Sequence, residues 1–252
     1  MHVLLLKSAG ESGSDSKDDP YYQVLSSAGN EVTLIETLDF HYHTDVLGKY
    51  QSWTDTHSAI VFTSPRAVNA FIKAGLKGKP TDLCFVVGPA TEAQAKRAGF
   101  SPKGASKGDA EELAKYIVSD FGKELTKPVF FPTGQLHRDV LPTYLEKHEI
   151  KVESVTTYSS KENEKLKERF RLCLCEGNPI PDCVVFFSPS GVSLTEDILK
   201  SEVKPHRPKI QLVAMGRATA SRLKEIGVDA SAVSPSPKPE SLLSVIKSLR
   251  KS

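Results

Sequence analysis

The fold is decided by two similar stretches, "FTSPRAV" at residues 62–68 and "FFSPSGV" at residues 186–192. Each continues a short apolar run that is typical of a buried β-strand, "SAIVF" in the first and "CVVFF" in the second. Serine is a preferred helix N-cap, and proline is favoured at the first helical position. Ser64 and Ser188 are therefore each expected to begin a helix at the carboxyl end of a strand.

Further matches occur in the same order in the two halves of the chain. The segment "VVGPATEAQAKRAGF" from Val86 resembles "VAMGRATASRLKEIGV" from Val213, and "VLSSAGNEVTLIETL" from Val24 resembles "YLEKHEIKVESVTTY" from Tyr144. We name the successive segments A, B, A′ and B′, where B and B′ contain the Ser-Pro stretches. This order indicates a duplicated architecture. Composition alone allows A to pair with B, or B to pair with A′.

Short apolar runs alternate with amphipathic helical segments along most of the chain. The runs "VLLL", "AIVF", "CFVV", "PVFF", "CVVFF" and "IQLVAM" predict buried strands. Strands that alternate with helices favour parallel sheets covered on both faces. The sequence therefore predicts an α/β protein with two similar domains.

Composition excludes several classes of function. The 252 residues carry a formal charge of only +2, which does not indicate nucleic-acid binding, and no apolar run reaches the length of a membrane span. The four cysteines form no CxxC pair and are expected to be reduced thiols of a cytoplasmic protein. Cys173 with Cys175, or His41 with His43, could contribute to a metal site, but two ligands do not make one. No dinucleotide, P-loop or nucleophile-elbow motif is present.

The predicted helix starts indicate an anion-binding site. In open α/β sheets ligands bind at the carboxyl ends of the strands, and a helix N-terminus there offers N–H groups and partial positive charge. "VGPAT" at Val87, "MGRAT" at Met215 and "FPTGQ" at Phe131 fit the same description as the Ser-Pro stretches. The alternative is that all of these are ordinary caps that bind nothing.

The ordered set of motifs resembles the uroporphyrinogen-III synthase family, and its animal branch most of all. The resemblance runs essentially end to end through "FTSPRAV", "VVGPAT", "FPTGQLHRDVLP", "VTTYSS", "FFSPSGV", "MGRATA" and "SPSPKPESL". Arg217 stands where this family often has proline.

The resemblance implies a substrate, a reaction and a domain organisation. The substrate would be hydroxymethylbilane, a linear tetrapyrrole rich in carboxylates, which loses its terminal hydroxyl as water and closes with ring D inverted. No metal and no organic cofactor would be needed. Two flavodoxin-like domains, residues 1–37 plus 161–252 and residues 38–160, would face each other across a cleft and be joined by two crossing connections. A monomer is expected, with the upstream bilane-forming enzyme as a candidate partner.

The resemblance also implies site residues. Tyr158 is the candidate for chemistry, because a phenol is protonated at neutral pH and can donate to the departing hydroxyl. The alternative is a half-buried strand tyrosine that holds a backbone carbonyl. Arg66 and Arg138 could equally be solvated helix residues. A non-enzymatic protein that binds an anionic metabolite is the rival function. The residues expected to bind substrate are Thr63, Ser64, Arg66, Thr91, Ser188, Ser190, Gly191 and Thr219.

Overall fold

The computed structural model describes residues 1–8, 16–136, 139–175, 180–203 and 209–250. The chain divides into two compact units, which we call unit 1 (Met1–Asp39 with Lys161–Ser252) and unit 2 (Phe40–Ser160). The boundary expected after residue 37 thus falls after residue 39, and the return falls after residue 160. Unit 2 is an insertion within the sequence of unit 1.

Unit 1 contains a five-stranded sheet in the order β10-β9-β8-β1-β2, and all its pairs are parallel. Numbered by their order within the unit, the strands lie 2-1-3-4-5, which is the flavodoxin-like arrangement. The strands are β1 (His2–Lys7), β2 (Glu31–Glu36), β8 (Cys183–Phe186), β9 (Gln211–Met215) and β10 (Ala232–Ser234).

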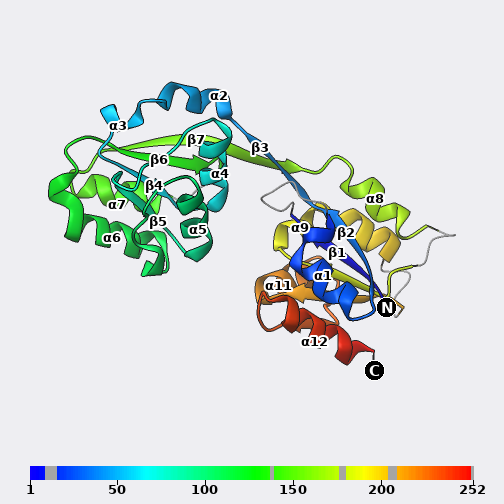
Figure 1. Ribbon diagram of the computed structural model, residues 1–252. Helices are drawn as coiled ribbons and strands as arrows, with labels where there is room; N and C mark the ends of the chain where they lie inside the picture. Colours follow the sequence, from blue (N-terminus) through cyan, green and yellow to red (C-terminus); the bar gives the residue numbers. More distant parts are fainter. Residues whose placement is uncertain (9–15, 137–138, 176–179, 204–208, 251–252) are drawn as a thin grey trace. The chain divides into compact units, whose positions relative to one another are not determined.

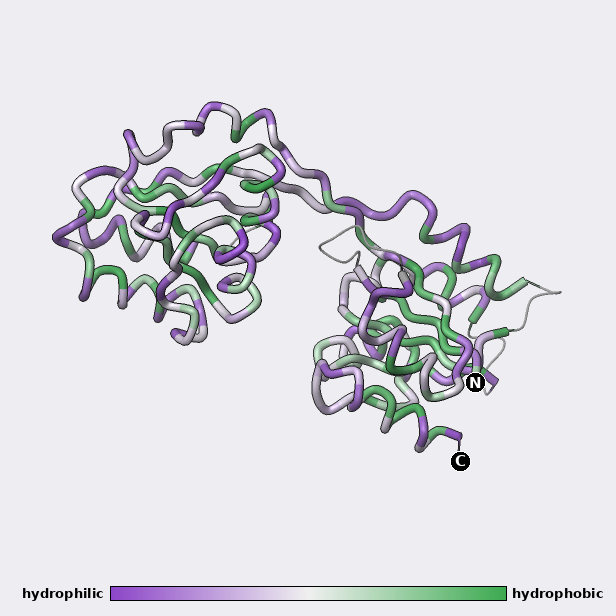
Figure 2. Tube along the Cα trace, in the orientation of Figure 1, coloured by the Kyte–Doolittle hydropathy of each residue, from purple (hydrophilic) through white to green (hydrophobic). Residues whose placement is uncertain are grey.

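Helices cover both faces of this sheet (Figure 1). Along β1, Leu4 and Leu6 pack into the cluster that contains α8, α9 and α11, whereas Val3 and Leu5 pack against α1 and α12. Because both faces are covered, the central strands β1, β8 and β9 are mainly apolar, and Figure 2 shows hydrophobic residues along the strands. The helices are α1 (Pro20–Ser27), α8 (Leu166–Leu172), α9 (Pro189–Leu194), α10 (Glu196–Ile198), α11 (Arg217–Glu225) and α12 (Pro239–Leu249), with a 3-10 turn η1 (Ser16–Asp18) and a π-helical turn η5 (Leu199–Val203).

Unit 2 has the same strand order with a different starting point. Its sheet runs β3-β7-β6-β4-β5, with parallel pairs β4–β5, β4–β6 and β6–β7. If β6, β7, β4 and β5 are numbered 1 to 4, their order in the sheet is 2-1-3-4, as in unit 1. The strand in the third position, β4, therefore comes earlier in the sequence than the strand in the first position, β6. A single bridge between Phe85 and Lys103 occupies the fifth position, and β3 adds an extra edge beside β7. The strands are β3 (Leu38–Tyr42), β4 (Ala59–Phe62), β5 (Cys84–Val86), β6 (Val129–Gly134) and β7 (Val152–Glu162).

The helices of unit 2 are arranged like those of unit 1. Ile60 and Phe62 of β4 share a cluster with α2, α3, α4 and α5, while Ala59 and Val61 face α6 and α7. The helices are α2 (Thr44–Leu47), α3 (Trp53–Thr56), α4 (Pro65–Lys73), α5 (Pro89–Arg97), α6 (Ala110–Phe121) and α7 (Val140–Lys147), with 3-10 turns η2 (Gly48–Tyr50), η3 (Ala105–Lys107) and η4 (Gly122–Glu124).

The strand order settles how the repeats pair. Segment A (β1-α1-β2) shares a sheet with B′, and segment B shares one with A′ (β6-α7-β7). Val3 pairs with Val32 in unit 1 as Val129 pairs with Val152 in unit 2. The predicted α/β class with two similar, mainly parallel sheets is confirmed, and the consecutive pairing of A with B is wrong. Within the described ranges, none of the helices has the length and apolar character that a membrane span requires.

Candidate functional site

The two Ser-Pro stretches form the predicted helix caps. Ser64 (φ −149°, ψ 138°) is the N-cap of α4, and its Oγ accepts a hydrogen bond from the Arg66 N–H at 3.1 Å. Ser188 (φ −153°, ψ 157°) is the N-cap of α9, and its Oγ accepts from the Gly191 N–H at 3.2 Å. The same extended backbone and side-chain acceptor therefore recur at the carboxyl end of the third strand in each sheet.

Glycine caps the next helix in each unit. Gly88 (φ 78°, ψ 157°) precedes α5, and Gly216 (φ 91°, ψ 166°) precedes α11. This backbone region is open to glycine and strained for other residues, which explains the shared "G" of "VGPAT" and "MGRAT". Gly216 has nearly the same backbone conformation as Gly88. Gly216 is followed by Arg217 and Gly88 by Pro89, so this type of cap does not depend on proline.

A β-bulge aims Tyr158 at the α4 cap. β7 pairs Thr156 with Thr133, but the next pair is Tyr158 with Gly134, so one residue is extra. That residue, Thr157, is fully buried, and its Oγ1 donates to the Thr133 carbonyl at 3.1 Å. A bulge turns the following side chain away from its regular direction. The Tyr158 hydroxyl consequently donates to Ser64 Oγ at 3.2 Å.

The partner of Tyr158 differs from the one expected of a purely structural tyrosine. The alternative interpretation gave it a backbone carbonyl, whereas the structure gives it the Ser64 hydroxyl, which already accepts from the Arg66 N–H. Ser64 Oγ thus accepts two hydrogen bonds, which use both of its lone pairs. Its O–H group can still donate one hydrogen bond. Gly134 allows this arrangement, because a Cβ there would lie 2.6 Å from Cζ of Tyr158.

Arg66 lies against an aromatic ring that the sequence analysis missed. Its guanidinium carbon is 3.9 Å from the centroid of the Phe40 ring, and its Nε is buried without a hydrogen-bond acceptor. The Phe40 and Tyr158 rings meet edge to face, with centroids 6.5 Å apart. Arg66 is therefore not a solvated helix residue. No sequence signal pointed to Phe40, whereas Gly134 could have been noticed as the glycine of "FPTGQ".

The corresponding edge of unit 1 carries hydroxyls and a lysine. The hydroxyl oxygens of Ser188 and Ser190 are 2.9 Å apart, and Gly191 is buried. Lys7, at the end of β1, forms an ion pair with Asp19, the N-cap of α1. Its ammonium lies 5.5 Å from the Tyr21 ring centroid and 5.8 Å from that of Phe187. Lys7 was also missed, although it ends the "VLLLK" strand.

The remaining predicted residues are placed less favourably for side-chain contact. Thr91 and Thr219, in the first turns of α5 and α11, are each only 2% exposed, and the Thr219 hydroxyl donates to the Met215 carbonyl at 3.4 Å. Thr63 is half-buried directly after β4. The backbone brings the α5 turn beside β4, because the Val87 N–H donates to the Phe62 carbonyl at 3.1 Å. Arg138 lies outside the described residues.

Neither candidate metal pair gains a further ligand among the described residues. The His41 and His43 rings lie 5.0 Å apart, and burial raises the pKa of the Cys173 thiol. Across the described ranges, no three His, Cys, Asp or Glu side chains are grouped in a way that could hold a metal ion.

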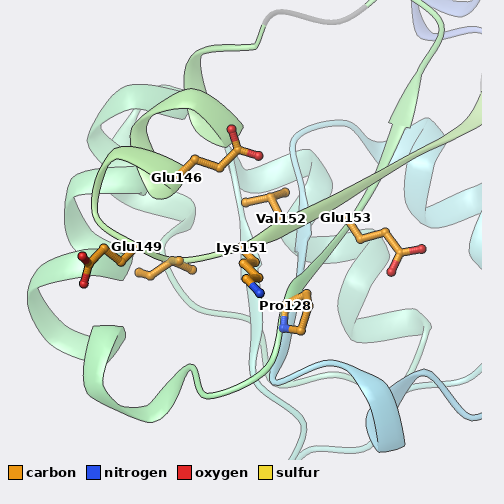
Figure 3. Close-up of a pocket in the computed structure, with 7 residues that line it drawn as sticks. Pro128, Glu146, Glu149, Lys151, Val152 and Glu153 are labelled. Atoms are coloured by element: carbon orange, nitrogen blue, oxygen red, sulfur yellow. The ribbon is translucent and has the colours of Figure 1, made fainter.

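A cavity of about 710 Å³ lies elsewhere in unit 2, at the amino-terminal end of β7 and thus at the opposite edge of the sheet (Figure 3). The carboxylates of Glu146, Glu149 and Glu153 point in different directions around it. An acidic, divergent lining does not suit the anion that the helix starts are predicted to bind, so the carboxyl edge stays our candidate site despite the size of this cavity. It is lined by Pro128, Glu146, Glu149, Ile150, Lys151, Val152 and Glu153.

A hydrogen-bonded network borders that cavity. Glu153 accepts from the Tyr50 hydroxyl at 2.6 Å and lies 2.9 Å from Nε2 of His57. The Tyr50 hydrogen bond, followed by His57, holds the pKa of the Glu153 carboxyl below its usual range. Burial and the Glu153 carboxylate raise the pKa of Tyr50 to about 12. The network ties the segment before β4 to β7 and is structural.

Comparisons with known proteins agree with this architecture. A family model described as "Uroporphyrinogen-III synthase HemD" matches residues 19–244. The uroporphyrinogen-III synthase of Saccharomyces cerevisiae is 28% identical over 81% of this chain and 80% of its own. That of Schizosaccharomyces pombe is 27% identical over 90% of this chain and 91% of its own. Both relatives are fungal, so the animal branch stays a prediction.

Solved structures share the fold. The uroporphyrinogen-III synthetase of Helicobacter pylori superposes with a TM-score of 0.61 at 15% identity, covering 98% of this chain and 99% of that one. A mutant uroporphyrinogen III synthase from the extremely thermophilic bacterium Thermus thermophilus gives a TM-score of 0.57 at 14% identity, covering 100% of this chain and 99% of that one. The family model spans most of the chain, and the chain therefore belongs to the uroporphyrinogen-III synthase family.

Proposed function

We propose that this protein converts hydroxymethylbilane to uroporphyrinogen III, with loss of water and inversion of ring D, in haem and tetrapyrrole biosynthesis. The observation that carries the proposal is the family match over residues 19–244. The two matched sets of helix starts support it, because they suit a substrate that carries many carboxylates.

Substrate binding is proposed to involve both units. In unit 2, Thr63, Ser64 and Arg66 would contact the substrate, with Arg66 as the charged group. In unit 1, Ser188 and Ser190 would offer their hydroxyls, and Gly191 would keep the backbone accessible. We assign Thr91 and Thr219 a backbone role, because both side chains are buried while the N–H groups of a first helical turn lack intrahelical acceptors. That the two sets face each other across a cleft remains a prediction.

Tyr158 is proposed to assist the departure of the hydroxyl group. In the substrate-free protein its O–H donates to Ser64 Oγ. With substrate bound, the same proton would pass to the hydroxyl oxygen as the C–O bond breaks, so that the oxygen leaves as water. The resulting cationic bilane would close through ring D, and the proton released as the macrocycle forms would restore the phenol. Because the bilane also closes spontaneously to the wrong isomer, most of the enzyme's work is to fix orientation.

The isomer of the product tests this proposal. Purified protein is mixed with freshly prepared hydroxymethylbilane without added metal or nucleotide, and the oxidised products are separated by chromatography. We expect mainly the type III macrocycle. If folded protein slows the closure of the bilane but gives only the spontaneous type I isomer, the non-enzymatic binding function is correct instead.

We further propose that the protein acts as a cytoplasmic monomer and receives the bilane from the enzyme that forms it. The lability of the free bilane supports direct transfer. Sedimentation of this protein alone and with the bilane-forming enzyme tests both points. A dimer of the protein alone would contradict the monomer. If the mixture with the bilane-forming enzyme contains no complex at micromolar concentrations, direct transfer is contradicted.

A further inference from the structure

We infer that Phe40 is a positioning residue, whose ring holds the Arg66 guanidinium ready for a substrate carboxylate and orients the Tyr158 phenol beside it. This inference rests on the proposed function. Nothing in the motif set included Phe40, and it enters through the contacts of its ring.

The ring of Phe40 contacts both polar residues of the site. Its face carries the Arg66 guanidinium, with 3.9 Å from the guanidinium carbon to the ring centroid. Its edge meets the Tyr158 ring at an interplanar angle of 62°. Phe40 is half-buried and belongs to neither hydrophobic cluster identified among the described residues of unit 2. The ring therefore has contacts that core packing does not explain.

Arg66 carries a positive charge that no described acidic side chain pairs with. Within the described parts of the chain it forms no ion pair, whereas Arg171 pairs with Asp197 and Glu202. Its Nε is buried and has no acceptor. A buried donor left unpaired is unfavourable and calls for an explanation, and a bound ligand that accepts from it is the explanation we adopt.

Stacking prepares the guanidinium for a carboxylate. A guanidinium is planar and presents its N–H groups in a fixed fork that matches a carboxylate. When one face lies on an aromatic ring, the plane of the fork is fixed before the substrate arrives, so less freedom is lost on binding. Ser64, whose Oγ accepts from both the Arg66 backbone and Tyr158, links the cation to the phenol. Phe40, Ser64, Arg66 and Tyr158 thus form one closed set of contacts.

Steady-state kinetics with hydroxymethylbilane test the inference. Phe40→Leu removes the aromatic face, and we expect KM to rise about tenfold, or about 1.4 kcal/mol. Phe40→Tyr keeps the face and should recover most of that loss. In an Arg66→Ala background, Phe40→Leu should change KM less than about twofold, because the cation it positions is gone. Phe40→Met, whose unbranched and flexible side chain can better fill the space left by the ring, is the second variant if leucine lowers the melting temperature.

Tyr42→Leu is the matched control. Tyr42 lies two residues further along β3, and its ring also carries a cation, with Lys73 Nζ 5.2 Å from the centroid. Its removal should leave KM for the bilane within about twofold of the wild type, since Lys73 ends α4 and lies far from the α4 cap.

A readout without substrate separates this inference from the proposed function. The NMR signal of the Arg66 Nε–H proton can be assigned by its disappearance in Arg66→Ala. This proton should exchange slowly with water in the wild type and in Phe40→Tyr. In Phe40→Leu it should exchange so fast that its signal is lost. A wild type that makes no type III product would overturn the proposed function alone. An active wild type whose KM and Nε–H signal are both unchanged by Phe40→Leu would overturn the positioning role.

Discussion

Gly134 and Tyr158 share one space: a Cβ on Gly134 would lie 2.6 Å from Cζ of the tyrosine ring and 2.8 Å from its hydroxyl oxygen. Gly134→Ala must therefore displace the ring. We expect the fold to survive and turnover to fall roughly 10²-fold, as when an acid catalyst is misplaced. Gly48→Ala is the control, because nothing lies within 4 Å of a Cβ there. An active Gly134→Ala enzyme would show that the ring can move without consequence.

Tyr158→Phe removes only the hydroxyl that donates to Ser64. We expect turnover to fall roughly 10²-fold with little change in KM, because the group acts as the C–O bond breaks. Single-turnover measurements with the bilane check this. Unchanged turnover would assign Tyr158 to structure.

Alanine at Ser64 or Ser188 removes a helix cap. Each variant should lose about 1 kcal/mol of stability and retain part of its activity, because the backbone donors remain. The control is Asp109→Ala, which removes the cap of α6, where Oδ1 accepts from the Glu111 and Glu112 N–H groups at 2.9 and 3.0 Å. Urea unfolding and isomer assays compare the three. Complete loss of activity from a folded Ser64→Ala or Ser188→Ala protein would contradict the proposed role of backbone donors.

The Tyr50–Glu153–His57 network should make stability depend on pH at both extremes. The pKa of Glu153 is lower in the folded protein, so its contribution is present above about pH 4 and is lost as pH falls through the folded value. The pKa of Tyr50 is raised to about 12, so its contribution is present below about pH 10 and is lost as pH rises toward that value. Urea unfolding of the wild type and Glu153→Gln across pH 3–6 checks the acid side. The variant should lose less stability on acidification, and equal slopes would contradict the assignment.

The strand order predicts which fragments of the chain can fold by themselves. A fragment of residues 38–160 contains the second sheet except for the last two residues of β7 and should fold alone. A fragment of residues 1–125 lacks β6, β7 and β8, so β1 and β4 each lose their central neighbours. Circular dichroism and urea melting decide the matter. A cooperative transition for the second fragment and none for the first would contradict the prediction.

Much of this architecture could be predicted from local sequence. Ser64 and Ser188 precede proline directly, and a cap depends on only a few consecutive residues. The repeats also gave the equivalence of Gly88 and Gly216, whose positive φ angles explain why both are glycine. The correct pairing of B with A′ required the family resemblance, because strand neighbours depend on contacts between distant segments.

The part that escaped prediction depends on tertiary contacts. Phe40 stacks on Arg66 because β3 lies beside β7, and no pattern around residue 40 encodes that neighbour. The direction of Tyr158 follows from a bulge at Thr157, which regular alternation along "VESVTTY" cannot reveal. The burial of Thr91 and Thr219 likewise reflects helix packing rather than the residue type.

The insertion of unit 2 into unit 1 has a consequence for synthesis on the ribosome. Residues 40–160 emerge before β8, β9 and β10, so unit 2 can complete its sheet while unit 1 has only β1 and β2. Once it does, the His43 N–H bonds the Thr157 carbonyl at 2.8 Å, and the two ends of the insertion are held together. Closing a flexible loop of this length would otherwise cost about 4 kcal/mol of chain entropy. A folded insertion therefore lowers the entropy that unit 1 loses when β1 pairs with β8, a strand that follows the whole of unit 2 in the sequence.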